Sequence, residues 1–245
     1  MFRQQEIVKT LMTPGAFELY EGRPVTNPYC VAMLFAHINA IFHVDEEKPP
    51  PLKGYEMHIL TTTDKPQATS KQQRFAPIEQ KFLGVKCKKL EGQEIIELSE
   101  SAYRAPLMLV QYVDRVKDFM KRFGDKAIEA MDNPEYADLV AAFYRLTVDL
   151  RLLNALTVPD RQPMPRISDV LDSFAGDQFF SCFDIKDAFW TVLLALSDRH
   201  KTAFATHNTL YQWCRMPQGS RAGANTWARI IQSCLEDRPS TVAPF

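Results

Sequence analysis

The sequence predicts an α+β fold in which an antiparallel sheet is backed by helices. Two observations support this class: strand-like and helix-like segments are interleaved toward the C-terminal end, and farther upstream an amphipathic segment separates two strand-like ones. The composition agrees, because 245 residues with 46% hydrophobic and 24% charged side chains suit a globular domain with a substantial core. A collagen-like, coiled-coil or wholly disordered chain is therefore excluded.

The upstream elements follow from hydrophobic periodicity. Residues 76–96 are predicted to form a helix, which Gly84 and Gly92 weaken. Residues 105–112 and 144–150 are predicted as strands, the second from its period-two alternation. Between these strands the apolar residues recur every three or four positions, as in an amphipathic helix: Val113, Val116, Met120, Phe123, Ala127 and Met131.

The downstream elements are shorter. One helix is predicted over residues 167–174 and another over residues 222–235. The strands predicted between them are residues 178–185, 191–196, 202–206 and 210–216, with a turn at residues 206–209. In the first of these strands Phe180, Cys182 and Asp184 share one face, so an acid ends a buried row.

A proline run marks a predicted domain boundary. Residues 1–50 have mixed polarity and lead into Lys48-Pro-Pro-Pro51, a stiff extended connector. We therefore treat residues 1–55 as an upstream segment and linker of unknown role, and residues 56–245 as the domain that carries the chemistry.

The sequence predicts neither a membrane span nor export. Its longest apolar stretch, Cys30 to Phe42, is interrupted by His37 and Asn39 and is shorter than the roughly 20 residues of a membrane span. The first residues lack the basic-then-apolar order of a secretory signal. We expect an intracellular protein, cytoplasmic or nuclear and not secreted, with no membrane partner.

The cysteines are odd in number and no two lie within four residues of one another, which predicts neither a disulfide framework nor a zinc site. We expect all five to be reduced thiols of the core: Cys30, Cys87, Cys182, Cys214 and Cys234.

Charge is distributed unevenly along the chain. The formal net charge is −1, yet residues 71–90 hold six basic side chains and one acid. Such a run is usually a solvated helix face, and the alternative is a surface that binds phosphate groups.

Asp184 is the first candidate for chemistry. It ends a predicted apolar strand and is followed by Lys186, Asp187 and the pair Phe189-Trp190. A carboxylate is costly to bury unless a cation neutralises it. Asp184 is therefore either a solvent-facing turn residue or a metal ligand.

Four sequence blocks occur in order: Tyr144-Arg-Leu-Thr-Val-Asp-Leu-Arg-Leu-Leu-Asn154, Thr157-Val-Pro-Asp-Arg-Gln-Pro-Met-Pro-Arg-Ile167, Phe179-Phe-Ser-Cys-Phe-Asp-Ile-Lys-Asp-Ala-Phe189, and Lys201-Thr-Ala-Phe with Leu210-Tyr-Gln-Trp-Cys-Arg-Met-Pro-Gln-Gly219. Together they resemble a reverse transcriptase of the long-terminal-repeat retrotransposon (gypsy-like) and retroviral type. Residues 101–110 are similar to the family more weakly, and the resemblance extends over residues 56–236. It implies a fragment of the polymerase right-hand fold, made of the fingers and part of the palm.

The resemblance implies an RNA-directed DNA polymerase that adds deoxynucleotides to a primer on an RNA or DNA template. In this reaction two Mg²⁺ ions, or Mn²⁺ in their place, stabilise the attacking and the leaving oxygens. Asp184 is expected to bind both ions, and the backbone carbonyl of Ile185 to complete the shell of one.

The same resemblance assigns four residues to the deoxynucleoside triphosphate. Arg145 is expected to clamp the phosphates, Phe189 to exclude a ribose 2′-hydroxyl, and Gln218 and Gly219 to form the pocket floor. Each has an ordinary alternative: an ion pair of Arg145 with Asp149, a core position for Phe189, and a simple turn for Pro-Gln-Gly.

Nucleic-acid contacts are implied for a further set of cations. Arg151 is expected against the template strand, with a surface role as its alternative. The basic helix is expected to face phosphates through Lys81, Lys86, Lys88 and Lys89.

Three departures from the family pattern limit these expectations. The family's other metal-binding acids lie in an aromatic-x-Asp-Asp hairpin downstream of the Gln218 position, and the sequence contains no Asp-Asp pair. The amphipathic excursion at residues 113–131 replaces a short hairpin whose Lys contacts the γ-phosphate, leaving Lys121 and Lys126 as candidates. Trp227 lies near the position where the family usually has a Phe, and Ala224 lies near the position where the family usually has a Pro.

The expected chain is therefore a polymerase fragment truncated before the Asp-Asp hairpin and inactive alone. The alternatives are a decayed or co-opted remnant that binds nucleic acid without catalysis, and a purely structural role.

Overall fold

The computed structural model describes residues 50–68, 73–163, 166–172, 174–176, 185 and 187–235. The chain divides into two units, Met1–Pro50 and Pro51–Phe245, and the fold presented below is that of the second. Residues 1–49 of the predicted upstream segment and most of the strand predicted at residues 178–185, Asp184 included, lie outside the described residues.

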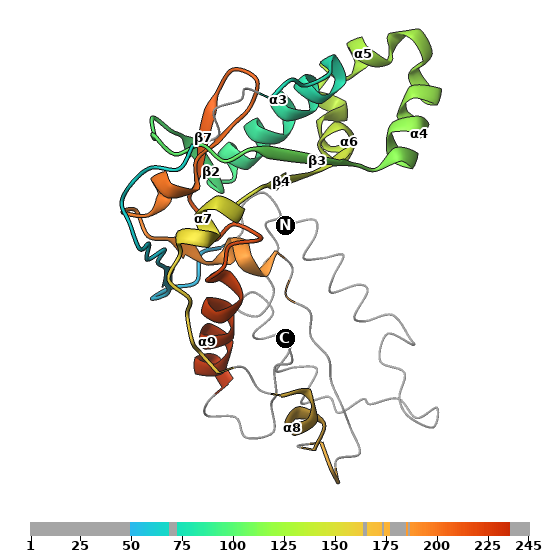
Figure 1. Ribbon diagram of the computed structural model, residues 1–245. Coiled ribbons are helices and arrows are strands. Elements are labelled where there is room, and N and C mark those ends of the chain that lie inside the picture. Colours follow the sequence, from blue (N-terminus) through green and yellow to red (C-terminus); the bar gives the residue numbers. More distant parts are fainter. Residues whose placement is uncertain are drawn as a thin grey trace. The chain divides into compact units, whose positions relative to one another are not determined.

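Helices account for much of the second unit (Figure 1). The α-helices are α3 (Pro77–Gly92), α4 (Val113–Phe123), α5 (Ala127–Ala130), α6 (Ala137–Ala141), α7 (Arg151–Leu156), α8 (Ile167–Asp172) and α9 (Gly223–Leu235). The 3-10 helices are η2 (Gly124–Lys126), η3 (Pro134–Tyr136), η4 (Ala188–Thr191) and η5 (Arg199–Thr202). The helices predicted over residues 76–96, 167–174 and 222–235 are confirmed in slightly shorter form. Within the described ranges, no helix combines the length and apolarity that crossing a membrane requires.

The strands are β1 (Glu56–Met57), β2 (Ile96–Leu98), β3 (Leu107–Gln111), β4 (Tyr144–Val148), β5 (Leu193–Leu194), β6 (Phe204–Ala205) and β7 (Leu210–Trp213). They form three small sheets: β1 with β5 in parallel, β2, β7 and β6 antiparallel in that order, and β3 with β4 antiparallel. The predicted turn at residues 206–209 joins β6 to β7, with the Thr206 N–H donating to the Thr209 carbonyl at 2.9 Å. The predicted α+β class is confirmed, with the described strands divided among three pieces.

The helix α3 begins and ends for local reasons. Pro77 occupies its first turn, and the Glu79 carboxylate accepts the Ala76 backbone N–H at 2.7 Å, which satisfies a free donor at the N-terminus. The helix stops at Gly92 because Glu94 has a left-handed φ of 54° and Ile96 then begins β2. Its buried face consists of Phe82, Leu83, Cys87 and Leu90.

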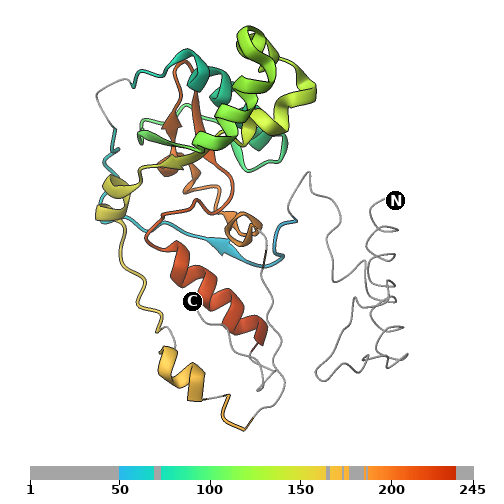
Figure 2. The same ribbon diagram turned by 90° about the vertical axis from the view of Figure 1, so that its right-hand side faces the viewer.

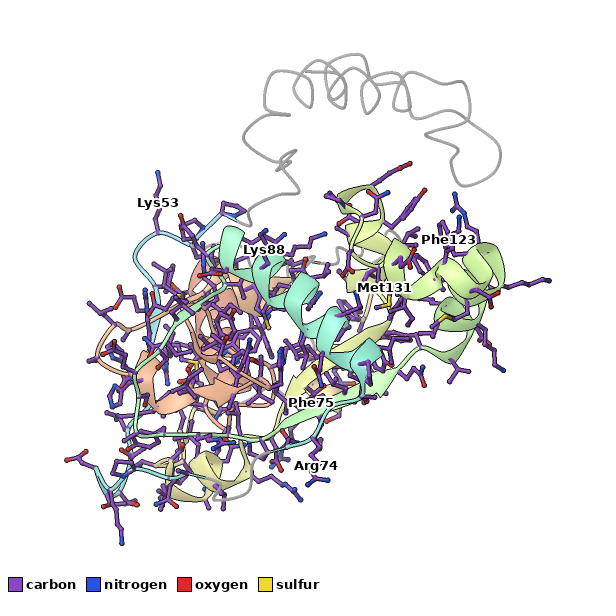
Figure 3. The ribbon with its side chains drawn as sticks, turned by 90° about the horizontal axis from the view of Figure 1, so that it is seen from above. Lys53, Arg74, Phe75, Lys88, Phe123 and Met131 are labelled. Carbon is purple, nitrogen blue, oxygen red and sulfur yellow. The ribbon has the colours of Figure 1, made fainter. Side chains whose placement is uncertain are left out.

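The predicted helix between β3 and β4 is an excursion of several short helices. Gly124 has φ 54° and ends α4, so the continuous helix expected over residues 113–131 is broken there. Aromatic rings hold the excursion together, with ring-centroid distances of 5.0 Å between Phe119 and Phe143 and 4.8 Å between Phe123 and Tyr136. Ion pairs from Lys81 to Asp132 and from Lys89 to Asp138 tie it to α3, and Figure 3 shows Met131 near that helix.

The cysteines are only partly where the sequence placed them. Cys87 and Cys214 are buried, and burial raises the pKa of each thiol to about 12. Cys234 is exposed near the end of α9, so its prediction as a core thiol is wrong; α9 is the red helix of Figure 2. The buried residues of α9 are Gly223, Thr226, Ala228 and Ile230, and Cys234 lies one turn beyond Ile230, where the helix is no longer covered. Cys30 and Cys182 lie outside the described residues.

A buried ion pair fixes the segment after β1. The Asp198 carboxylate accepts the Lys201 ammonium at 2.7 Å and the Ile59 backbone N–H at 3.1 Å, and Lys201 also donates to the Ile59 carbonyl at 2.7 Å. The two side chains are only 8% and 13% exposed. Although burial opposes it, the hydrogen bonds from Lys201 and Ile59 lower the pKa of Asp198.

Asp198→Asn should lower the free energy of unfolding of the full chain by on the order of 3 kcal/mol at pH 7, because it leaves a buried Lys201 without its counter-ion. The measurement is urea unfolding followed by circular dichroism. Because the folded-state pKa is lowered, this contribution is present above the ordinary carboxyl pKa of about 4 and is lost as pH falls below it. The variant should therefore lose less stability on acidification than the parent.

The matched control is Asp132→Asn, which removes the exposed partner of Lys81. A surface pair contributes about 0–1 kcal/mol. Equal effects of the two substitutions would contradict the role assigned to Asp198.

Candidate functional site

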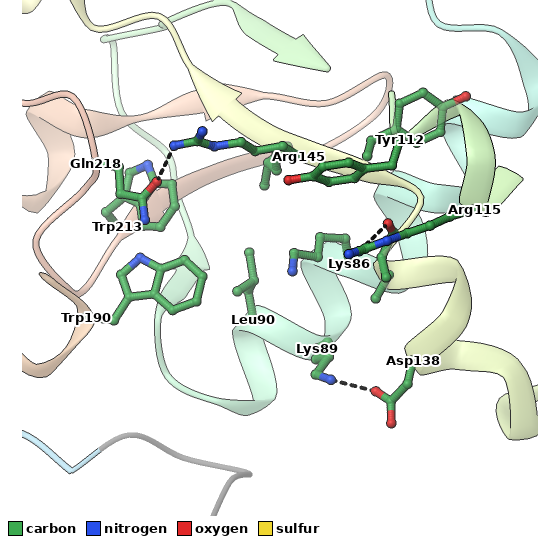
Figure 4. Close-up of a pocket in the computed structure, with 14 residues that line it drawn as sticks. Lys86, Lys89, Leu90, Tyr112, Arg115, Asp138, Arg145, Trp190, Trp213 and Gln218 are labelled. Carbon is green, nitrogen blue, oxygen red and sulfur yellow. Dashed lines mark hydrogen bonds and ion pairs between the residues drawn. The ribbon is translucent and has the colours of Figure 1, made fainter. Parts of the chain in front are cut away.

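One pocket brings together side chains from widely separated parts of the sequence. Its volume is about 420 Å³, within the range of small-molecule sites. Helices α3, α4 and α6, strand β4, η4 and the end of β7 with the loop that follows all contribute to it (Figure 4). The lining residues that carry polar or aromatic groups are Lys86, Lys89, Tyr112, Arg115, Asp138, Tyr144, Arg145, Trp190, Trp213 and Gln218.

The pocket is strongly positive although the chain as a whole has a net charge of −1. Its lining has a single carboxylate, and its four cations are Lys86, Lys89, Arg115 and Arg145. That carboxylate, Asp138, accepts Lys89 at 2.5 Å, and the hydrogen bond lowers the pKa of Asp138. The remaining three cations form no ion pair with the residues that the structure describes. The lining therefore favours an anionic ligand.

Arg145 and Gln218, both predicted for the nucleotide, meet in this pocket. The Arg145 guanidinium donates to the Gln218 side-chain oxygen at 3.2 Å. The register of β4 pairs Arg145 with Val110 of β3 and thereby fixes the position of the Arg145 backbone. The alternative ion pair between Arg145 and Asp149 is not formed. Asp149 instead accepts Arg151 through both carboxylate oxygens, at 2.6 to 3.0 Å.

The loop that carries Gln218 is held by an asparagine that received no role from the sequence. The Asn154 side chain donates to the Gly219 carbonyl at 2.8 Å and accepts the Arg221 backbone N–H at 2.8 Å. The Arg221 guanidinium in turn donates to the Asn154 backbone carbonyl at 3.2 Å. Gly219 has φ 83°, a conformation that other residues rarely adopt. This network positions the predicted pocket floor.

Two tryptophans of the pocket wall were also missed. Trp190 follows Phe189 in η4, and Trp213 ends β7. Their indole Nε1 atoms are buried and have no hydrogen-bond partner among the residues that the structure describes. Figure 4 shows both rings on the side of the pocket where Gln218 lies. An aromatic residue in a short helix or at the end of a strand is usually a core residue, so neither tryptophan could be recognised from the sequence.

The basic helix does not act as one surface. Lys81 is paired with Asp132, and Lys89 with Asp138. Lys88 is exposed, whereas Lys86 is half-buried and lines the pocket. Burial and the neighbouring Lys89 charge lower the pKa of Lys86, while Asp187 opposes this. Lys86 and Lys89 thus lie in the same pocket as Arg145, although the sequence assigned them to nucleic acid.

The remaining predicted residues lie elsewhere. Phe189 is not in the pocket lining, and its ring meets Trp227 of α9 edge-on with centroids 6.5 Å apart. Ile185 is 49% exposed, and Asp184, expected beside it as the metal ligand, lies outside the described residues. Where the structure is described, no three acidic, histidine or cysteine side chains cluster closely enough to hold a metal ion.

Comparison with known proteins gives a consistent result. Residues 138–242 match the family described as reverse transcriptase (RNA-dependent DNA polymerase). Among curated proteins, the Pol polyprotein of transposon gypsy from Drosophila melanogaster is 31% identical over 157 residues, which covers 64% of this chain and 13% of that protein. The enzymatic polyprotein of cauliflower mosaic virus (strain Strasbourg) is 27% identical over 67% of this chain and 21% of its own length.

Solved structures match the fold of this chain over a larger share of its length than the curated proteins match its sequence. A prototype foamy virus protease-reverse transcriptase matches with a TM-score of 0.67 at 16% identity, over 97% of this chain and 27% of that one. The foamy viral protein in complex with an RNA/DNA hybrid matches with a TM-score of 0.60 at 14% identity, over 89% and 26%. The chain thus spans between 13% and 27% of the length of these relatives.

Asn154→Ala should loosen the loop at residues 217–221, because the Arg221 N–H loses its acceptor and the Gly219 carbonyl loses its donor. We expect a loss of stability of about 1–2 kcal/mol, and faster amide hydrogen exchange at Arg221. The control is Asn225→Ala, which removes a side-chain hydrogen bond to the Asp160 carbonyl and leaves this loop untouched. Unchanged exchange in the Asn154 variant would show that the loop is held by other contacts.

Proposed function

We propose that the pocket binds the deoxynucleoside triphosphate of an RNA-directed DNA polymerase, as the match of residues 138–242 to the reverse transcriptase family and the similarity to gypsy-like and retroviral relatives support. The observation that carries the proposal is the contact of Arg145 with Gln218 inside a cationic pocket. The described part of the chain supplies the fingers and part of the palm.

The chemistry of the pocket suits this substrate. A guanidinium presents a fixed fork of donors that matches phosphate oxygens. Arg145 binds the phosphates, and its contact with Gln218 keeps the guanidinium oriented while the site is empty of substrate. The Gly219 backbone, held in place by Asn154, allows a sugar to approach closely. Phe189 is proposed to exclude a ribose 2′-hydroxyl from a position next to this pocket.

The metal ions of the reaction are part of the proposal. Reverse transcriptases generally use divalent metal ions, and Mg²⁺ or Mn²⁺ supplies charge neutralisation at the reacting phosphate. Asp184 and the Ile185 carbonyl are the ligands that this sequence offers. Because no acid cluster occurs among the described residues and the sequence has no Asp-Asp pair, we derive no catalytic step through the metal.

Template and primer are the proposed macromolecular partners. Solved relatives are complexes with an RNA/DNA hybrid and with double-stranded DNA. In this chain Lys88 is exposed on α3, and Arg151 is exposed on α7 beside Asp149. We propose that these two cations contact the nucleic-acid backbone, because the Arg151 side chain is 85% exposed even in its pair with Asp149, whereas the paired Lys81 and Lys89 are 28% and 42% exposed.

Arg145→Ala should weaken binding of a deoxynucleoside triphosphate to the full chain by about 10- to 100-fold, the loss expected for charge-assisted hydrogen bonds. Arg145→Lys should restore only part of the affinity, because an ammonium lacks the planar fork. Calorimetric titration with dTTP measures both. Arg122→Ala, which changes an exposed arginine stacked on Phe123, is the control. Equal affinities of the Arg145→Ala variant and the parent chain would refute the proposal.

The exposed Lys88 of α3 favours a second candidate function, a remnant that binds nucleic acid without polymerising. Both functions predict that binding of an RNA/DNA hybrid weakens as the salt concentration rises. The slope of log affinity against log salt concentration should correspond to about two to four phosphate contacts, because several lysines are already paired. Lys88→Gln should reduce the slope by about one. Filter binding at several salt concentrations measures it, with Lys117→Gln on the exposed face of α4 as control.

Binding of the hybrid without any affinity for dTTP would favour the remnant over the polymerase fragment. Hybrid binding that does not change with salt would contradict the role of Lys88.

A further inference from the structure

Arg215 is a buried cation that the proposed nucleotide site does not use. It follows the end of β7 by two residues and precedes Gln218 by three, and it is only 2% exposed. It does not belong to the pocket lining. Because arginine is rarely buried in this way unless its charge is compensated, the surroundings of this side chain need a physical explanation.

The backbone around Arg215 joins two of the small sheets. The Cys214 N–H donates to the Ile95 carbonyl, just before β2, at 2.9 Å. On the other side, the Leu194 N–H of β5 donates to the Cys214 carbonyl, also at 2.9 Å. The segment therefore extends β7 between β2 and β5. Continuing the antiparallel register of β2 and β7 places Arg215 opposite Glu94.

The Arg215 side chain reaches the C-terminal end of α3. Its Nε donates to the carbonyl of Glu94, the residue after the C-cap Gln93, at 3.3 Å. The end of a helix at which its carbonyls are exposed carries a partial negative charge, which favours a cation there. Burial lowers the pKa of the Arg215 guanidinium and the charge of Glu94 opposes this shift, so the side chain stays protonated.

The guanidinium also has a donor that is not used. Its Nη1 is buried and has no hydrogen-bond partner within the described ranges. A buried donor without an acceptor is destabilising, and an apolar side chain of similar length would fill the same space without that loss. Arg215 therefore supplies something that packing alone does not. The directed hydrogen bond from Nε to the turn after α3 is the contact that supplies it.

Both elements that Arg215 joins extend into the pocket. Helix α3 contributes Lys89 to the lining, and the chain that follows Arg215 contributes Gln218. Asn154 holds the same loop from its downstream side, through the Gly219 carbonyl at 2.8 Å. The loop is thus anchored on both sides of Gln218, upstream to the end of α3 and downstream to α7.

We propose that Arg215 is a positioning residue for the pocket. By joining the end of β7 to the turn after α3, it sets where Gln218 lies relative to α3 and to Arg145, and it contacts no ligand itself. This inference rests on the proposed function, because it takes the contact of Arg145 with Gln218 as part of a nucleotide site.

The test compares Arg215→Met and Arg215→Lys with the parent, all as the full chain. Arg215→Met keeps an unbranched apolar side chain and removes the charge and the donors. It should lower the affinity for dTTP about tenfold, because a misplaced binding group loses its contact, and it should speed amide hydrogen exchange at Gln218 and Gly219. Arg215→Lys should recover part of both, because it keeps a cation and a donor but not the planar fork. Calorimetric titration and hydrogen exchange measure the two effects.

The matched control is Asp198→Asn, which breaks another buried charged contact, the one with Lys201 and Ile59. It should also destabilise the chain, but it should change neither the exchange at Gln218 nor the affinity for dTTP. A purely structural role of Arg215 would make the two variants alike in these measurements. Circular dichroism verifies that each variant is folded under the conditions of titration.

If Arg215→Met changes exchange at Gln218 and dTTP affinity no more than Asp198→Asn does, Arg215 merely stabilises the fold and the inference is overturned. Should Arg215→Met fail to fold, Arg215→Lys decides: reduced affinity with faster exchange at Gln218 supports the positioning role, and parental values overturn it. A parent chain that does not bind dTTP would remove the proposed function, and exchange at Gln218 would still decide whether Arg215 positions the loop.

Discussion

The antiparallel ladder between β3 and β4 is the constraint on which the pocket depends. Its register pairs Leu107 with Val148 and Gln111 with Tyr144, which fixes Arg145 at the edge facing α3 and the Gln218 loop. A shift of one residue would turn Arg145 to the other face of the pair. This one register determines three features: the cationic pocket, the contact of Arg145 with Gln218, and the separation of Arg145 from Asp149.

Much of this arrangement could be predicted from sequence because it is local. Period-two alternation located β4, and the order of motifs along the chain singled out Arg145 and Gln218 before any contact between them was known. The amphipathic excursion was predicted as well, but as a continuous helix. Its break depends on the left-handed conformation of Gly124, and a glycine within a helical pattern does not by itself indicate whether the helix bends, ends or continues.

The parts that could not be predicted are those that depend on how elements pack. Periodicity shows that α3 is a helix with a basic surface, but not which of its lysines turns toward a strand that begins more than fifty residues later. Lys86 and Lys88 are equivalent in composition, and only the packing of α3 against β4 and α6 separates them. For the same reason Trp190 and Trp213 were indistinguishable from core aromatics, and Asn154 from an ordinary helix residue.

The excursion between β3 and β4 also has a consequence for how the chain folds. Gln111 and Tyr144 can pair only after the intervening residues 112–143 have been closed into a loop, and this closure loses more chain entropy than a tight hairpin turn. The aromatic cluster of Phe119, Phe123, Tyr136 and Phe143 can compact that segment through contacts near in sequence. Early collapse of this cluster would shorten the effective loop, so that the ladder zips from Gln111 and Tyr144 toward Leu107 and Val148.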